Sequence, residues 1–256
     1  MLRRSLTVIA LALGVAIAPQ AARAAGEYDT PPPANLSFQG IFGTFDRASA
    51  QRGLQVYRQV CASCHGVRLI AFRNLRALGL TEEQVAAIAA EYQIQDGPND
   101  EGQMFERPGR ASDRFPRPFP NEAAARAANN GAYPPDLSVI IKARHYGANY
   151  LRAMLVGYQD PPEGTQVGEG LHYNRYFPGR QIAMPNVLFD DMMEFADGTP
   201  ATAEQMARDV TTFLAWAAEP EMEQRRQMGI RVVLFLLILG GLTYAVKRRV
   251  WADVKH

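Results

Sequence analysis

The segment Cys61-Ala62-Ser63-Cys64-His65 constrains this chain more than any other, because it contains both of the cysteines in the sequence. Two thiols separated by two residues and followed at once by an imidazole suit three kinds of site. These are a redox dithiol, part of a zinc site and a covalent anchor for haem. The rest of the sequence helps to choose among these three kinds of site, and the two ends of the chain are considered first.

Residues 1–24 are predicted to be a cleaved signal peptide. Arg3 and Arg4 form a positive region, an apolar stretch follows from residue 6 to residue 18, and residues 22–24 form a small-x-small cleavage site. A retained membrane anchor is the alternative, but the apolar stretch is short for one. We therefore expect the mature chain to be exported.

Residues 227–247 are predicted to be a membrane anchor. From Met228 to Val246 the only charged residue is Arg231, which lies near enough to the start to reach the membrane surface. About twenty helical residues cross a hydrocarbon core of about 30 Å. A buried helix of a soluble core is the alternative, but the basic residues at 247–249 are typical of a cytoplasmic stop signal.

The two ends predict a single topology. Residues 25–226 form one exported domain, and residues 248–256 form a cytoplasmic tail, as in a single-pass protein of the bacterial inner membrane with its domain in the periplasm. About two hundred residues are enough for one domain with its own core. The formal net charge of +1 predicts no nucleic-acid partner.

These features favour haem attachment at the cysteine segment. A zinc site needs four ligands, and the sequence has no second cysteine pair and only isolated further histidines. A thioredoxin-like dithiol follows a strand, whereas Leu54 and Tyr57 precede Cys61 at helical spacing. A c-type haem needs two thiols for its vinyl groups and an adjacent imidazole for its iron. Cys61, Cys64 and His65 are therefore assigned to one covalently bound haem c.

Met184 is predicted to be the second axial ligand of the iron. Most methionines fill gaps in a core, and Met154 and Met206 have the helical spacing and apolar neighbours of such residues. Met184 instead lies in a loop-like stretch between Gly179 and Pro185, and the proline disfavours a helix there. A methionine ligand raises the reduction potential. An open sixth position, as in a haem enzyme or a gas sensor, is the alternative.

Helical patterns dominate the rest of the chain, so the predicted fold class is mainly α, with long loops wrapped round the haem and one C-terminal transmembrane helix. No period-2 strand pattern stands out, and long proline- and glycine-rich loops are expected at 96–121 and 160–178. Helices are expected before Cys61, after a Thr81 cap with Gln84 completing a capping box, from Asn121 to Gly131, within 137–155, and from Thr199-Pro200 onward.

The last of these helices carries an apolar face made of Met206, Val210, Phe213, Leu214 and Ala217. We expect the helix before Cys61 to cross it closely. Gly53 would permit the close approach, and Tyr57 would pack against residues 213–216.

One loop is acidic: residues 96–106 contain Asp96, Asp100, Glu101 and Glu106. A solvated loop is the favoured interpretation, because unpaired surface charges are ordinary and a base-rich stretch follows. A docking patch for a basic cytochrome is the alternative.

The sequence resembles the cytochrome c1 family, the haem subunits of the cytochrome bc1 complex. The resemblance rests on RGLQVYRQVCASCHGV, the PPDLS segment, the Met-Pro loop and WAAEPE before a single terminal anchor. It covers the chain except for the signal peptide and the last few residues. It implies covalent haem at Cys61 and Cys64, iron ligands His65 and Met184, and Arg144 near a haem propionate. It also implies hydrogen-bonding rather than ligating roles for the two histidines at positions 145 and 172.

The resemblance further implies a function. The chain would relay single electrons from the Rieske iron–sulfur protein to a soluble or anchored c-type cytochrome, in the quinol–cytochrome c reductase of a respiratory or photosynthetic chain. It would be an electron-transfer subunit rather than an enzyme on its own. Its anchor would pack beside cytochrome b in a dimeric complex. An anchored cytochrome of a terminal oxidase or a nitrogen-oxide reductase is the alternative.

Overall fold

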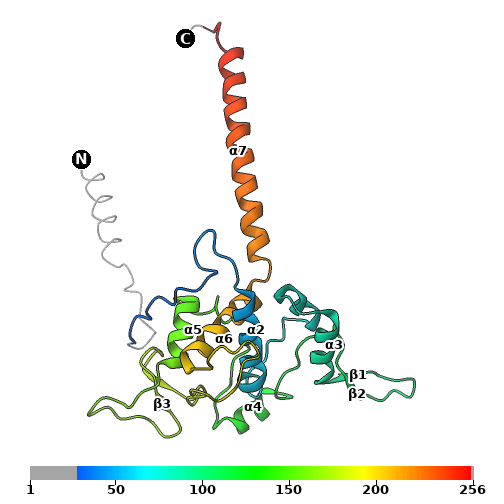
Figure 1. The fold of residues 1–256 in the computed structure, drawn as a ribbon, viewed down its shortest axis with the longest axis vertical. Helices are drawn as coiled ribbons and strands as arrows, with labels where there is room; N and C mark the ends of the chain where they lie inside the picture. The colour runs from blue at the N-terminus through cyan, green and yellow to red at the C-terminus, as the bar shows by residue number, and fades with distance from the viewer. Residues whose placement is uncertain (1–27, 255–256) are drawn as a thin grey trace, which may run out of the picture.

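The structure is a computed structural model that describes residues 28–254, so the predicted signal peptide lies outside the described residues. Short helices and long loops form a body, and the helix α7 (Met222–Val250) extends away from it (Figure 1). The prediction of a mainly α fold with one long C-terminal helix is confirmed.

The body contains five α-helices and two further short helical segments. The π-helix Tyr57–Cys61 continues α2, and a 3-10 helix covers Phe72–Leu78. The α-helices are α2 (Arg47–Val56), α3 (Glu82–Ala90), α4 (Glu122–Ala128), α5 (Gly147–Val156) and α6 (Ala203–Ala218).

Two short antiparallel strand pairs also form, which sequence periodicity did not predict. The strand β1 (Gln93–Asp96) pairs with β2 (Phe105–Pro108), and β3 (His172–Tyr173) pairs with β4 (Gln181–Ile182). With four and two residues per strand, they are too short for an alternating pattern to stand out. Each pair lies within or at the edge of a predicted loop.

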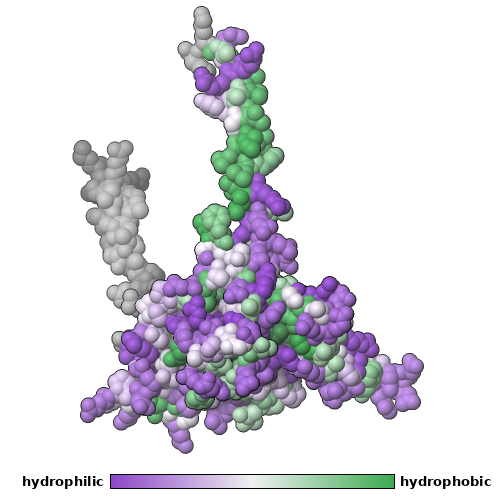
Figure 2. Space-filling model, viewed as in Figure 1, coloured by the Kyte–Doolittle hydropathy of each residue, from purple (hydrophilic) through white to green (hydrophobic). Residues whose placement is uncertain are grey.

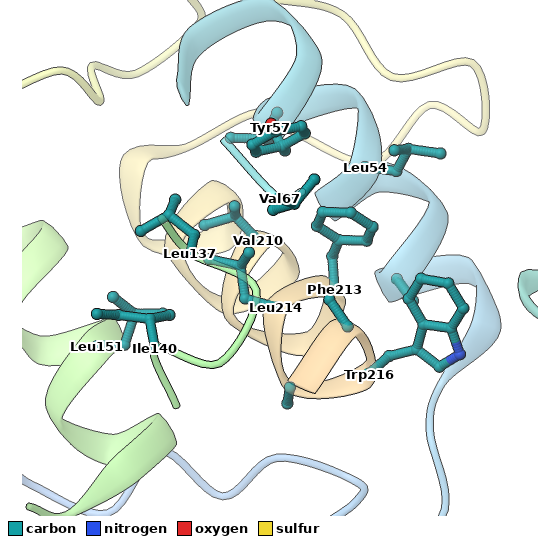
Figure 3. Packing of buried hydrophobic residues seen from close by; sticks show 14 of the residues in the cluster. Leu54, Tyr57, Val67, Leu137, Ile140, Leu151, Val210, Phe213, Leu214 and Trp216 are labelled. Carbon is teal, nitrogen blue, oxygen red and sulfur yellow. The ribbon is translucent and has the colours of Figure 1, made fainter. Parts of the chain in front are cut away.

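The centre of the body is the crossing of α2 and α6, as predicted. A Cβ atom added at Gly53 would lie 2.0 Å from the Asp209 carbonyl oxygen and 2.8 Å from the Phe213 Cβ atom, so only glycine fits there. The rings of Tyr57 and Phe213 are 5.6 Å apart. Figure 3 shows apolar side chains of α6 gathered with those of α2.

The predicted apolar face of α6 is entirely buried. The predicted start of this helix at Thr199-Pro200 is wrong, because α6 begins at Ala203 with Thr202 as its cap. Another loop holds this start: Ala203 donates its N–H to the Asp190 carboxylate at 2.8 Å, and Asp191 donates its N–H to the carbonyl of Ala201, which precedes the helix, at 3.0 Å.

Two other predicted helix starts are confirmed, whereas α4 ends at Ala128, before the predicted stop at Gly131. Thr81 and Gln84 form both bonds of the capping box of α3, at 3.2 and 2.8 Å, and Asn121 caps α4. Within residues 137–155 only α5 forms an α-helix, and the chain before it is a series of turns.

The helix α7 has the length and composition of a membrane span. Its 29 residues correspond to about 44 Å at about 1.5 Å per residue, more than the hydrocarbon core of a bilayer. Its most apolar 18-residue window has a mean hydropathy of 2.1, and none of that window is buried against the body. Figure 2 shows it as an apolar band between polar ends.

Candidate functional site

The cysteine segment follows directly from α2. The Asp46 carboxylate caps this helix by accepting from the N–H groups of Ala48 and Ser49. At Tyr57 the helix widens into a π-helix that ends at Cys61, a distortion that is frequent at functional sites. Cys64 and His65 then donate their N–H groups to the Cys61 carbonyl oxygen, which holds the segment in a tight turn.

The two thiols are not joined to each other. Cys61 and Cys64 are both partly buried and both free. Burial, and secondarily the nearby Cys64, raise the pKa of the Cys61 thiol to about 12. A thiol of this kind is a poor metal-binding or redox thiolate at neutral pH, which disfavours the dithiol interpretation.

His65 is held by a backbone carbonyl from a distant segment. Its Nδ1 atom lies 2.8 Å from the Pro135 carbonyl oxygen, which can only accept, so Nδ1 carries the proton. Burial lowers the pKa of His65 and outweighs this hydrogen bond, which favours the neutral ring. The Nε2 lone pair is then available to a metal, an arrangement typical of histidine ligands.

The segment from Pro134 to Ser138 is bound along the cysteine motif by further hydrogen bonds. Leu137 donates its N–H to the Gly66 carbonyl at 2.7 Å, and Leu69 donates its N–H to the Ser138 hydroxyl at 3.1 Å. Asp136 accepts from the N–H groups of Arg68 and Ser138. Two stretches about seventy positions apart therefore form one unit.

A cavity of about 390 Å³ opens beside this unit. Its lining includes Cys64, Gly66, Tyr133, Pro134 and Pro135, together with several charged side chains. The cavity reaches Cys64, but neither Cys61 nor His65 lines it, so it marks one edge of the site.

Met184 lies elsewhere in the body and is positioned independently. It is partly buried and packs against the apolar core. Its carbonyl oxygen accepts a hydrogen bond of 2.9 Å from the Tyr158 hydroxyl. Burial raises the pKa of Tyr158, so this hydroxyl stays protonated and can donate. Met184 does not line the cavity beside Cys64, and no hydrogen bond among the described residues links its loop to His65.

Arg144 is exposed and also lies outside that cavity. Its guanidinium donates to the Ala143 carbonyl at 3.2 Å and interacts with Tyr150. Neither predicted hydrogen-bonding histidine makes a side-chain hydrogen bond within residues 28–254. The ring of His145 packs on Tyr146 at 4.0 Å, and His172 is part of β3.

Several residues of the site were not predicted from the sequence. Pro135 and Asp136 hold the cysteine segment, Tyr158 holds the Met184 loop, and the Tyr57 hydroxyl donates to the His65 carbonyl at 3.0 Å. The PPDLS segment contributes to the family resemblance, but its sequence carries no signal for the segment it will contact.

These residues fit a covalently bound haem. Two free thiols are available to form thioether bonds, and the imidazole of the residue after Cys64 has Nε2 free of the Pro135 hydrogen bond. Within residues 28–254 no group of three His, Cys, Asp or Glu side chains is arranged to hold a metal ion, which disfavours zinc. A mainly helical body with this motif and one apolar helix defines a membrane-anchored c-type cytochrome.

Comparison with known proteins identifies the family. Residues 36–254 match the Cytochrome C1 family. The chain is 58% identical to "Cytochrome c1-2, heme protein, mitochondrial" of Solanum tuberosum, over 84% of this chain and 83% of the relative. It is 51% identical to "Cytochrome b-c1 complex catalytic subunit, mitochondrial" of Candida albicans, over 92% and 82%. It is 52% identical to "Cytochrome b/c1" of Bradyrhizobium diazoefficiens, over 91% of this chain and 37% of that longer protein.

The chain therefore belongs to the cytochrome c1 family. It is a membrane-anchored electron-transfer protein with a covalently bound c-type haem, and it is a component of the cytochrome b-c1 complex.

Proposed function

We propose that this chain relays single electrons from the Rieske iron–sulfur protein to a soluble or anchored c-type cytochrome. Membership of the cytochrome c1 family supports the role, and the apolar helix α7 supports a fixed position at the membrane. The chain would act as an electron-transfer subunit without catalysis of its own, and quinol oxidation would belong to the whole assembly.

In this proposal Cys61 and Cys64 hold the haem, and His65 and Met184 are the ligands of its iron. The observation that carries it is the hydrogen bond between His65 Nδ1 and the Pro135 carbonyl, because this bond orients the ring and leaves Nε2 for a metal. The partly buried thioether of Met184 is a suitably soft second ligand.

When bound, the haem supplies reversible one-electron exchange at its iron. The exchange would be fast because the residues around the iron move little when its charge changes. Pro135 prevents rotation of the His65 ring, and Tyr158 restrains the backbone of Met184. The buried side chains of Val67 and Leu137 exclude water from the side of the site where the two segments join.

Arg144 is proposed to lie near a haem propionate. Arg144 is exposed, and the Ala143 carbonyl and the Tyr150 hydroxyl engage only part of its five N–H donors, so donors remain for a carboxylate. A propionate next to a fixed positive charge would stay ionised.

We further propose the topology and the partners. Lys247, Arg248 and Arg249 at the C-terminal end of α7 support a cytoplasmic tail, and hence a bacterial inner-membrane protein with its haem domain in the periplasm. The helix α7 would pack beside cytochrome b in a dimeric complex. Co-purification of cytochrome b with the tagged full chain tests this, and co-purification of terminal-oxidase subunits instead would contradict it.

The ligand assignment is tested by the Met184→Leu variant. We expect the wild-type ferrous protein to be low-spin and inert to carbon monoxide, and the variant to bind the gas and lose its high reduction potential. Reduced-minus-oxidised visible spectra with and without carbon monoxide measure the binding of the gas, and a redox titration measures the potential. Met154→Leu is the matched control, because Met154 is a buried core methionine and should behave as wild type.

The opposite result would change the function. If the wild-type protein already binds carbon monoxide, its sixth position is open, and the chain would be a haem enzyme or a gas sensor. If Met154→Leu and Met184→Leu behave alike, Met184 is not the ligand.

A further inference from the structure

A short loop near the start of the body exposes two large apolar side chains at its tip. Ile41 is 76% exposed and Phe42 is 81% exposed, more than any large apolar side chain of α7. No charged residue lies between Leu36 and Phe45. Such exposure normally marks a surface that is covered by something else.

This tip loop, residues 39–43, is fastened to the beginning of α7. The Arg226 guanidinium donates to the carbonyl oxygens of Phe38 and Gly43, at 2.9 and 2.6 Å, and so holds both ends of the loop. Just beyond it, the Glu223 carboxylate accepts from the N–H of Phe45 at 2.7 Å. These hydrogen bonds fix the position of the loop along the axis of α7.

The position of the loop along α7 corresponds to the edge of the predicted membrane span. Arg226 lies one helical turn before Ile230, and the uninterrupted apolar sequence begins after Arg231. In Figure 1 the dark blue loop rises beside the lower turns of α7, and Figure 2 shows an apolar patch where the loop ends.

We propose that the tip loop is a second membrane contact, in which Ile41 and Phe42 enter the interfacial layer of the lipid bilayer beside α7. Apolar and aromatic side chains at this depth leave water while the backbone stays among the head groups. The patch continues the surface of α7. Two side chains without a groove offer far less area than the roughly 800 Å² that each partner of a stable protein interface buries, which favours lipid over protein.

The consequence is orientation of the body. A single helix leaves the body free to rotate and tilt about the anchor. A second contact, tied to the same helix by Arg226, restricts both movements and presents a constant face of the cytochrome domain to its partners. This inference rests on the membrane anchoring by α7 and not on the iron ligands.

Spin labels on the full chain with its haem attached test the proposal. Single cysteines are introduced as Phe42→Cys, Met104→Cys and Ile238→Cys. The chain is reconstituted alone into vesicles of phosphatidylcholine and phosphatidylglycerol, and collision of each label with oxygen and with a water-soluble nickel chelate is measured. Met104 is the matched control, because it is 55% exposed on the β1–β2 loop, away from α7 (Figure 1). Ile238 reports the membrane core.

We expect the ratio of oxygen to nickel collisions at position 42 to be several-fold higher than at position 104 and below that at position 238. Equal ratios at positions 42 and 104 would overturn the proposal. Protection of position 42 only in the assembled complex would also overturn it, in favour of a protein partner. A water-like ratio at position 238 would refute the anchor itself. Uptake of label by the wild-type chain would instead count against haem attachment at Cys61 and Cys64.

Discussion

At the scale of single residues, a proline carbonyl and a tyrosine hydroxyl position the two predicted iron ligands. Pro135 holds the ring of His65, and Tyr158 holds the backbone of Met184. Neither partner is itself a conventional metal-site residue. In the proposed site the first bond would fix the imidazole ring and the second would fix the loop backbone, as outer residues of metal sites do.

Tyr158→Phe should loosen Met184 without removing it. The variant loses one hydrogen bond, worth about 1 kcal/mol. We expect a modestly lower reduction potential and faster binding of cyanide to the ferric protein, measured by redox titration and stopped-flow absorbance. Tyr173→Phe is the control, because Tyr173 is buried but its hydroxyl makes no hydrogen bond to the described residues. Equal behaviour of the two variants would contradict a positioning role for Tyr158.

A buried ion pair at the same scale joins α2 to α6. The Arg52 guanidinium donates to both carboxylate oxygens of Asp209 at 2.8 and 3.0 Å, and the Asp209 side chain is only 1% exposed. The Asp209 carboxylate raises the pKa of Arg52, so the guanidinium remains charged.

Arg52→Met should destabilise the fold by about 3–5 kcal/mol, because it leaves the charge of Asp209 buried without its partner. Adding Asp209→Leu should recover most of this loss. Urea unfolding of the full chain in detergent measures both. A double variant as unstable as the single one would show that the loss comes from packing rather than from the unpaired charge.

At the scale of elements, the α2–α6 crossing connects the cysteine motif to the core. The rings of Tyr57 and Phe213 meet at this crossing, and the π-helix that begins at Tyr57 delivers Cys61 to the site. The approach of the two helices depends on the absence of a side chain at Gly53.

Gly53→Ala should therefore destabilise the protein by about 3 kcal/mol, since the added methyl group meets backbone that cannot move aside easily. Gly229→Ala is the matched control, because Gly229 is also helical but has nothing within 4 Å of the added atom. The free energy of unfolding should be lower for Gly53→Ala than for Gly229→Ala. A fully stable Gly53→Ala protein would mean that the crossing is looser than described.

At the scale of the whole molecule, the β1–β2 hairpin projects sideways from the body (Figure 1). Of its acids, Asp96 is paired with Arg107, and this partner lowers the pKa of its carboxyl group. Arg107 also binds Asp113 at 2.6 Å. The pairing leaves three exposed acids on the hairpin, namely Asp100, Glu101 and Glu106.

Neutralising these three acids together, as D100N, E101Q and E106Q, should leave electron transfer to a basic cytochrome c unchanged. The reason is that the hairpin does not contribute to the cavity at Cys64. The measurement is the rate as a function of ionic strength. A flatter salt dependence in the triple variant would support the docking alternative, and an unchanged one would support a solvated loop.

Features that depend on neighbouring residues could be predicted from the sequence alone. The haem motif, the caps at Thr81 and Asn121 and the apolar anchor each occupy a few turns of chain, so their chemistry is visible as spacing. Gly53 was also predictable, because a glycine on an apolar helix face suggests close approach. The short strands were not, because two to four residues show no clear alternation, and the start of α6 was not, because its first N–H binds Asp190 of another loop.

Only the tertiary structure decided which distant segments meet. Pro135 binds His65 across 70 positions of sequence, Arg52 binds Asp209 across 157, and Arg226 binds Phe38 across 188. Contacts of this kind follow from the packing of the whole chain and leave no periodic pattern in it. The physical reason is that capping and helical periodicity act within a turn or two, whereas burial selects partners from the entire sequence.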